Sequence, residues 1–308
     1  MKVLVYCANG LQGQSTVHQL LKSGHQVRTL VRDTNRASPL AAAGAEIVFA
    51  DLDSDDLANL ERAHEGIDYV ILQLVAGDDG PTRKKKGLRA LECIRRGRGI
   101  KGVIFNAAVQ YPRHIEELPT WVATKGIEDE LRRRQIPFSV IHPTFYLDNL
   151  LLPYATYSIA STGVLAYPVS EQHAFAWTSA DDVARLIDHV LKHNVMGTSV
   201  LAGGKRAING VELAKCFSEG LGRAIRYQSL DLDQFEVSID QAIGPGVGKR
   251  ISAIFRFIER HPDDLEFLAR PFVQPAQMPA FEATDVTKWI AAHRAAHATI
   301  PAPQAANA

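Results

Sequence analysis

The chain has 308 residues, 46% of them hydrophobic and 22% charged, which is ordinary for a soluble globular protein. Its 34 Lys and Arg balance 34 Asp and Glu, and this zero net charge argues against a general nucleic-acid or membrane-surface binder. The three cysteines are widely spaced and indicate neither a metal site nor a disulfide framework. We expect no signal peptide, because Met1 and Lys2 lead straight into an apolar strand, and no membrane helix, because no apolar run nears roughly 20 residues. We therefore expect a cytoplasmic protein.

The first sixteen residues predict the opening of a dinucleotide-binding unit. Residues 2–7 form a short apolar strand pattern, and the apolar residues after Gln14 recur at helical spacing. The turn between them has the spacing G-x-x-G-x-x-G, with Cys7 in place of the first glycine. A helix N-terminus attracts pyrophosphate, and glycine allows close approach of the backbone. An ordinary turn before a helix is the alternative; the residues expected to bind cofactor here are Ala8, Asn9, Gly10, Leu11, Gln12 and Gly13.

Strands and helices alternate along the first half of the chain. The predicted strands cover residues 2–7, 25–32, 45–50, 69–74, 102–107 and 138–141. The predicted helices cover residues 55–63, 84–96 and 124–135, besides the one that begins at Gln14. Strands separated by helices of this length form a parallel sheet covered on both faces. We therefore predict an α/β fold with a doubly wound parallel sheet of the Rossmann type.

The alternation ends after His142-Pro143-Thr144. We predict helices at 179–193 and 211–220, an edge strand at 223–227 and a mainly helical segment at 233–296. The expected domains are a Rossmann domain at 1–150 with a return segment near 177–200, and a smaller, substrate-binding α/β cap at 151–176 and 201–297. The tail at 298–308, with two prolines and no periodicity, is expected to be disordered.

Five motifs spread over nearly the whole chain point to a family. They are Cys7-x-x-Gly10-x-x-Gly13, Val31-Arg32-Asp33, Ala50-Asp51-Leu52, Ile141-His142-Pro143-Thr144-Phe145-x-x-x-Asn149 and Thr178-Ser179-Ala180-Asp181-Asp182-Val183-Ala184. Together they resemble the NmrA-like branch of the atypical short-chain dehydrogenase/reductase superfamily. The resemblance implies either an NADPH-dependent reductase of quinones, enones or phenylpropanoids, or an NADP-binding sensor or regulator without known chemistry.

Arg32 ends the second predicted strand, where an NAD-binding protein would carry an acid that reads the ribose. A planar guanidinium pairs well with a 2′-phosphate. We therefore predict NADP(H) as the preferred cofactor, while the neighbouring Asp33 leaves NAD(H) open. Asp51 and Leu52 resemble the family's contact to the adenine edge, and a turn that caps the next helix is the alternative.

Trp121 and Lys125 have the spacing of the superfamily's Y-x-x-x-K motif, but the tyrosine is absent. In the enzymes that this chain resembles, the lysine holds the nicotinamide ribose and lowers the pKa of a neighbouring acid. An indole N–H has no useful acidity, so Trp121 cannot donate a proton to a carbonyl. We expect Lys125 to bind the cofactor and to act in catalysis.

Other side chains at the strand ends are candidates to replace the missing acid. Besides Lys125, the catalytic candidates are His142 and Tyr146. Asn106 stands near the family's serine position. The residues expected to contact substrate are Tyr111, Trp121, Phe145, Tyr146 and Trp177. The basic run at 83–86 indicates a solvated helix face.

The function predicted from these features is NADPH-dependent reduction of a small conjugated carbonyl or quinone by hydride transfer. The alternative is a noncatalytic NADP(H) sensor that binds a protein partner through the cap. The missing tyrosine favours the sensor, and the aromatic residues of the cap favour a pocket for a flat substrate. We expect no metal, nucleic acid or membrane as a partner.

Overall fold

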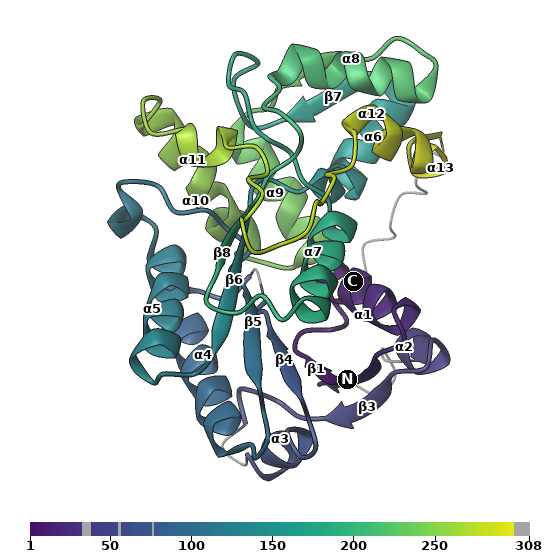
Figure 1. The fold of residues 1–308 in the computed structure, drawn as a ribbon. Helices are drawn as coiled ribbons and strands as arrows, with labels where there is room; N and C mark the ends of the chain where they lie inside the picture. Colours follow the sequence, from purple (N-terminus) through teal and green to yellow (C-terminus); the bar gives the residue numbers. More distant parts are fainter. Residues whose placement is uncertain (33–37, 55–56, 76, 299–308) are drawn as a thin grey trace, which may run out of the picture. The chain divides into compact units, whose positions relative to one another are not determined.

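The structure, a computed structural model, describes residues 1–32, 38–54, 57–75 and 77–298 (Figure 1). Contacts between residues divide the chain into two compact units. Unit 1 comprises residues 1–143, 180–202 and 273–281, and unit 2 comprises residues 144–179, 203–272 and 282–308. The tail predicted to be disordered lies, from residue 299 onward, outside the described residues.

Unit 1 is built on a parallel sheet with the strand order β3-β2-β1-β4-β5-β6-β8. Its strands are β1 Lys2–Val5, β2 Gln26–Val31, β3 Glu46–Phe49, β4 Tyr69–Leu72, β5 Gly102–Asn106, β6 Phe138–Pro143 and β8 Ser199–Ala202. The chain proceeds outward from β1 to β3 and then outward on the other side from β4 to β8, so the order reverses between β1 and β4. This topology confirms the predicted doubly wound fold. The sequence placed the first six strands to within two residues and missed β8.

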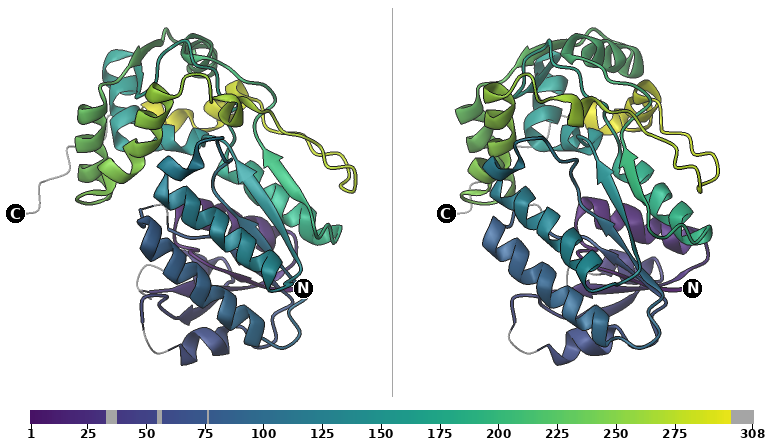
Figure 2. Two further views of the ribbon diagram at one scale, coloured as in Figure 1. Left: turned by 90° about the vertical axis from the view of Figure 1, so that its left-hand side faces the viewer. Right: turned by 60° about the vertical axis from the view of Figure 1, so that its left-hand side comes forward.

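Helices cover both faces of this sheet (Figures 1 and 2). On one face α1 (Leu11–Lys22) packs against α7 (Ala180–Lys192), and on the other α4 (Gly80–Arg96) packs against α5 (Pro119–Arg133). The shorter helices are α2 Ser38–Ala42, α3 Ala58–Ala63 and the 3-10 turn η2 Ile115–Glu117. Every residue of β4 and β5 is buried, which is why these strands read as continuous apolar runs.

The basic run at the start of α4 is only half solvated, so the sequence prediction was wrong for two of its residues. Arg83 and Lys86 are 5% and 6% exposed, whereas the two lysines between them are exposed. Residues three apart share one helix face, and this face is the buried one. Lys86 binds Asp78 at 2.9 Å and Asp53 at 3.0 Å. Burial opposes the charge of Lys86, but the two carboxylates outweigh it and raise its pKa.

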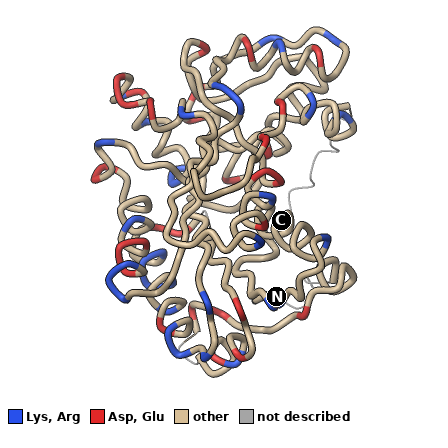
Figure 3. Tube along the Cα trace, viewed as in Figure 1, with Lys and Arg blue, Asp and Glu red and all other residues tan. Residues whose placement is uncertain are grey.

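The outer faces of α4 and α5 carry ion pairs at helical spacing, and Figure 3 shows acidic and basic residues interleaved along them. Glu92 contacts Arg95 and Arg96, and these two hydrogen-bonding partners lower its pKa to about 2. Glu130 contacts Arg133 and Arg134 in the same way. Ion pairs at the surface of a helix contribute little to stability, so their main effect is to keep these two faces electrically neutral.

Unit 2 contains a two-stranded parallel sheet, β7 (Val164–Tyr167) beside β9 (Arg226–Ser229). Its helices are η3 Leu147–Leu151, α6 Pro153–Thr162, α8 Gly210–Leu221, α9 Leu232–Ile243, α10 Val247–Arg260, α11 Glu266–Ala269, α12 Val286–Ala292 and α13 Arg294–Ala298. The predicted helix at 211–220 is confirmed, but β7 was missed and β9 was placed three residues early. The sequence of β9 is Arg-Tyr-Gln-Ser and most of it is exposed, so it contains no apolar run that would mark its bounds.

No helix in the described ranges is long and apolar enough to cross a membrane. Across those same ranges, no three His, Cys, Asp or Glu side chains gather in a way that would hold a metal ion.

Candidate functional site

The turn between β1 and α1 has the backbone shape of a phosphate-binding turn. Cys7, at the position of the missing first glycine, adopts a left-handed conformation with φ of 50°. Its carbonyl oxygen accepts a hydrogen bond from the Gly10 N–H at 3.2 Å, which closes the turn. A Cβ on Gly13 would lie 2.3 Å from the same oxygen, so only glycine fits there. Cys7 contributes no charge, because burial raises the pKa of its thiol to about 11.

Helix α1 begins directly after this turn without a side-chain cap. Gly10 is the N-cap, and the first N–H groups of a helix have no partners inside the helix. Gln14 donates from Nε2 to the carbonyl oxygen of Asn9 at 2.9 Å, which fastens the turn to the helix. The Oδ1 atom of Asn9 is buried without a hydrogen-bond partner. Uncapped N–H groups beside an unpaired side-chain oxygen fit a dinucleotide, whose phosphates accept hydrogen bonds and whose ribose hydroxyls donate them.

Three amide side chains join the turn to the neighbouring strands. Asn106 donates from Nδ2 to Oε1 of Gln12 at 3.1 Å and to Oε1 of Gln73 at 3.4 Å. Gln73 donates in turn to the carbonyl oxygen of Tyr6 at 3.0 Å. These residues come from the carboxyl ends of β1, β4 and β5 and from α1, where the strand order reverses and such sheets bind ligands. Sequence reasoning missed Gln73, because it stands inside an apolar run.

Arg32, predicted to select NADP(H), lies directly after β2 with its side chain 62% exposed. Its Nη1 atom is 4.0 Å from Oδ2 of Asp53, and Lys86 holds the same carboxylate more closely at 3.0 Å. The guanidinium is therefore loosely held and open to an anion. Asp33 and Arg36, which the prediction also weighed, lie outside the described residues.

Asp51 orders its own loop rather than capping a helix. Its Oδ1 atom accepts the Asp53 N–H at 2.9 Å, and α3 does not begin until Ala58. Leu52 packs against the apolar core, and its carbonyl oxygen accepts a hydrogen bond from Arg89 at 2.8 Å. The loop therefore holds a carboxylate and an apolar side chain in place at the end of β3.

Lys125 stands in the middle of α5, one turn after Trp121. Its Nζ atom lies 2.9 Å and 3.0 Å from the two carboxylate oxygens of Asp129, and its side chain is 44% exposed. An exposed pair four residues apart on a helix stabilises by about 0.5 kcal/mol at most. The ammonium is therefore available to another acceptor at little cost.

Half-buried Tyr111 and the buried residues Glu128 and His142 form a cluster where α5 meets β6. His142 donates from Nδ1 to the carbonyl oxygen of Val109 at 3.1 Å, which leaves its Nε2 atom 3.8 Å from Oε2 of Glu128. The Tyr111 ring meets the imidazole edge-on, with centroids 5.1 Å apart. Burial lowers the pKa of His142, although the charge of Glu128 acts to raise it. Burial and the charge of Glu128 both raise the pKa of Tyr111. Two predicted residues thus meet around a carboxylate that sequence reasoning missed.

The remaining predicted residues, Phe145, Tyr146 and Trp177, belong to unit 2. The Phe145 and Trp177 rings lie 5.8 Å apart, and Tyr146 and Trp177 are only 6% and 3% exposed. A parallel bridge pairs Tyr146 with Thr178, which brings the two chain segments together. These aromatic side chains therefore form part of the interior of unit 2.

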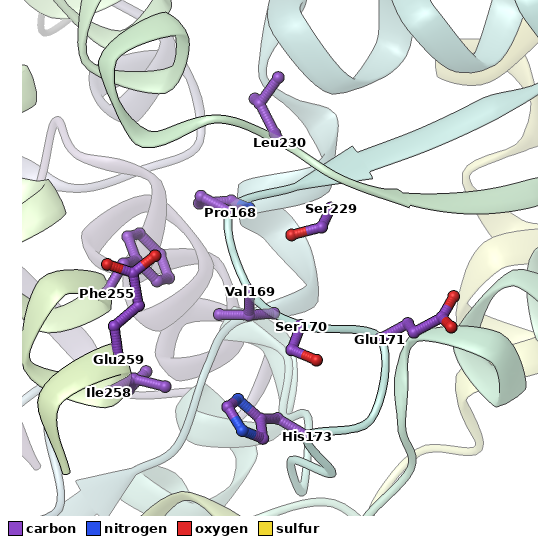
Figure 4. Close-up of a pocket in the computed structure, with 10 residues that line it drawn as sticks. All are labelled: Pro168, Val169, Ser170, Glu171, His173, Ser229, Leu230, Phe255, Ile258 and Glu259. Atoms are coloured by element: carbon purple, nitrogen blue, oxygen red, sulfur yellow. The ribbon is translucent and has the colours of Figure 1, made fainter. Parts of the chain in front are cut away.

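Unit 2 also contains a cavity of about 280 Å³ (Figure 4). Its lining residues are Pro168, Val169, Ser170, Glu171, His173, Ser229, Leu230, Phe255, Ile258 and Glu259. Figure 4 shows the three residues of α10 on one side and residues 168–173 on the other. Sequence reasoning singled out none of these ten residues, because they come from three separate segments.

The fold and the turn define a protein of the Rossmann dinucleotide-fold class. The NmrA-like family model matches residues 1–288, and the chain belongs to this family.

Two curated relatives span most of the chain. The chain is 23% identical over 259 residues to prestalk A differentiation protein A of Dictyostelium discoideum, covering 83% of this chain and 81% of the relative. It is 24% identical over 234 residues to an NAD(P)H azoreductase of Xenophilus azovorans, covering 75% and 78%.

Three solved structures share the fold. A Citrobacter triphenylmethane reductase with NADP(H) has a TM-score of 0.70 at 18% identity and covers 94% of this chain and 100% of that one. An Escherichia coli NADPH-dependent quinone oxidoreductase with NADPH has a TM-score of 0.70 at 19% identity, covering 94% and 99%. NmrA, a negative transcriptional regulator, in complex with NADP has a TM-score of 0.70 at 17% identity, covering 97% and 95%.

Proposed function

We propose that this protein is an NAD(P)H-dependent reductase, with NADP(H) preferred, that acts on a small conjugated carbonyl or quinone. The observation that carries the proposal is the turn that contains Cys7, Gly10 and Gly13. The helix α1 begins in this turn, and its N-terminal N–H groups have no side-chain cap. The azoreductase, triphenylmethane reductase and quinone oxidoreductase named above lend support, since they combine this fold with reduction of conjugated molecules.

The proposed cofactor contacts follow the carboxyl edge of the sheet. The turn at 8–13 would receive the pyrophosphate, Arg32 the 2′-phosphate, Asp51 and Leu52 the adenine, and Lys125 the nicotinamide ribose. The bound nicotinamide supplies the hydride. The residues at 151–176 and 201–297 would bind the substrate.

The proton that completes a reduction needs a source other than Trp121. We assign this role to His142, because its Nδ1 is committed to the Val109 carbonyl and its Nε2 faces Glu128. Burial lowers the pKa of His142 and the Glu128 carboxylate offsets this only in part, so a proton carried on Nε2 would be given up readily to a reduced substrate. Lys125 would orient the nicotinamide, and Tyr146 is the candidate from unit 2. A quinone needs only a weak acid, because hydride transfer to an electron-poor ring is the difficult step.

The competing proposal is a noncatalytic NADP(H) sensor that binds a protein partner. Trp121 in place of the superfamily's tyrosine favours it, and so does the likeness to NmrA, a negative transcriptional regulator.

One experiment separates the two proposals. NADPH oxidation is followed with a panel of small quinones, enones and azo compounds, and NADPH binding is measured in parallel by cofactor fluorescence. The reductase proposal expects saturable binding and turnover of at least one acceptor, lost in Lys125→Ala. Saturable binding without any turnover would support the sensor, and no binding at millimolar cofactor would overturn both.

A further inference from the structure

The cavity of unit 2 lies at the carboxyl edge of the small parallel sheet. Tyr167 and Ser229 are register partners at the ends of β7 and β9. Ser229 and the residues that follow both strands, at 168–170 and 230, line the cavity, and α10 closes it from the opposite side (Figure 4). Ligands of parallel α/β sheets bind outside the carboxyl ends of the strands, because the loops that follow them diverge there.

The inner wall of the cavity is apolar and rigid. Phe255 makes edge-on or tilted contacts with Phe145, Tyr167 and Phe235 at centroid distances of 5.6, 5.6 and 5.1 Å. Ile258, one turn later on α10, is 1% exposed. Aromatic rings packed in this way hold their positions. A volume of about 280 Å³ is just below that of pockets for drug-sized ligands, so the cavity suits a ligand of one or two rings.

The polar groups of the cavity are acidic or neutral. Glu259, on the same side as Phe255, is exposed and makes no ion pair with any described residue. Glu171 stands at another part of the rim, with its carboxylate directed outward (Figure 4). Burial lowers the pKa of His173, which therefore adds no positive charge near pH 7, and its Nδ1 is buried without a partner. The ten described lining residues include no Lys or Arg.

We infer that this cavity binds a small aromatic molecule that carries a positively charged amino group. The flat ring would lie against Phe255 and Ile258, where it is removed from water, and the ammonium would face the unpaired carboxylate of Glu259. The ring face of Phe255 adds attraction for a cation. A carboxylate-bearing ligand would meet like charge at the same rim. The cavity lies within the residues proposed above to bind the substrate, and the inference goes beyond that proposal because it names a class of ligand whose binding needs no cofactor.

Three probes of one shape test this inference on the full chain at pH 7, without cofactor. They are 1-naphthylmethylamine, 1-naphthalenemethanol and 1-naphthoate, which carry a positive, a neutral and a negative group on the same ring. Calorimetry or ligand-observed NMR should show the amine binding most tightly, with at least a tenfold advantage over the naphthoate. Equal binding of all three probes, or no binding of the amine, would overturn the inference.

Three variants locate the effect. Glu259→Gln should remove most of the preference for the amine while leaving the alcohol unchanged. Glu219→Gln, an exposed glutamate of α8 in the same unit, should behave like the wild type. Ser229 is exposed and lines the cavity, so the larger ring introduced by Ser229→Phe should fill the cavity and block all three probes. An unchanged preference in Glu259→Gln would place the binding elsewhere. NADPH titration of each variant keeps failure here distinct from failure of the proposed function.

Discussion

The carbonyl oxygen of Cys7 occupies the space that a side chain on Gly13 would need, with only 2.3 Å to an added Cβ. Gly13→Val should push α1 away from the turn and weaken NADPH binding at least tenfold, about 1.4 kcal/mol, in a fluorescence titration. Gly126→Ala is the control, since a Cβ at this glycine in α5 meets nothing within 4 Å. This control should raise the free energy of unfolding by about 0.5–1 kcal/mol and leave binding unchanged.

The loosely held guanidinium of Arg32 should separate the two nicotinamide cofactors. Arg32→Ala is expected to cost NADPH a charge-assisted contact of about 1.5–3 kcal/mol and to leave NADH affinity nearly unchanged. Lys85→Ala, an exposed cation on α4, serves as the control and should affect neither cofactor. Equal losses for NADPH and NADH in Arg32→Ala would mean that the residue acts on the fold.

Lys125 and Trp121 should differ in their effects on turnover. Lys125→Ala should lower kcat/KM at least tenfold, about 1.4 kcal/mol of transition-state stabilisation, because the nicotinamide is no longer oriented. Trp121→Phe should keep most of the activity, since only a flat apolar surface is required. Trp121→Tyr should help a ketone or aldehyde more than a quinone, because only the former needs a strong local acid. A large loss in Trp121→Phe would contradict this assignment.

His64 should make unit 1 sensitive to acid. Its Nδ1 donates to the carbonyl oxygen of Leu60 at 2.7 Å, and its Nε2 accepts the hydroxyl of Tyr6 at 3.0 Å. Burial lowers the pKa of His64 to about 4, so below pH 6.5 the unfolded chain takes up a proton that the folded protein refuses. The free energy of unfolding should therefore fall by about 3 kcal/mol between pH 6.5 and 4 from this residue.

Urea denaturation across that pH range measures the contribution of His64. His64→Gln should show a shallower fall of stability with acid than the wild type. His18→Gln, an exposed histidine on α1, should keep the wild-type slope. A wild-type slope in His64→Gln would show that the histidine titrates normally.

Asp188 should be the main polar tie between α1 and α7. Its carboxylate accepts hydrogen bonds from His25 at 3.0 Å and Ser23 at 2.6 Å, and it pairs with Lys192 at 2.9 Å. Burial opposes its ionisation, but these donors outweigh it and hold the pKa of Asp188 below its usual range. Asp188→Asn should lower the free energy of unfolding by about 1.5–3 kcal/mol. Asp181→Asn, exposed in the first turn of α7, should change it by less than about 0.5 kcal/mol.

The sequence predicted the central sheet because its signal is local. Buried parallel strands are apolar along their whole length, and each was followed by a turn and a helical period. The glycine turn was visible for the same reason, since Gly10 and Gly13 mark a backbone requirement within a few residues. The backbone conformation of Cys7 could not be predicted, because no sequence pattern indicates a left-handed φ at a cysteine.

The sequence by itself determined the family, the doubly wound sheet and the place of the glycine turn, because a strand, a turn and a helix that follow one another each leave a pattern in adjacent residues. Only the tertiary structure decided which side chains meet. It placed His142 of β6 beside Glu128 of α5 and joined Asn106 to Gln73 by a hydrogen bond. It also buried Lys86 between two acidic side chains, although the charged run around it predicts a solvated helix face. These contacts join side chains from different elements of the fold, so the packing and charge pairing that select them leave no periodic pattern in the sequence.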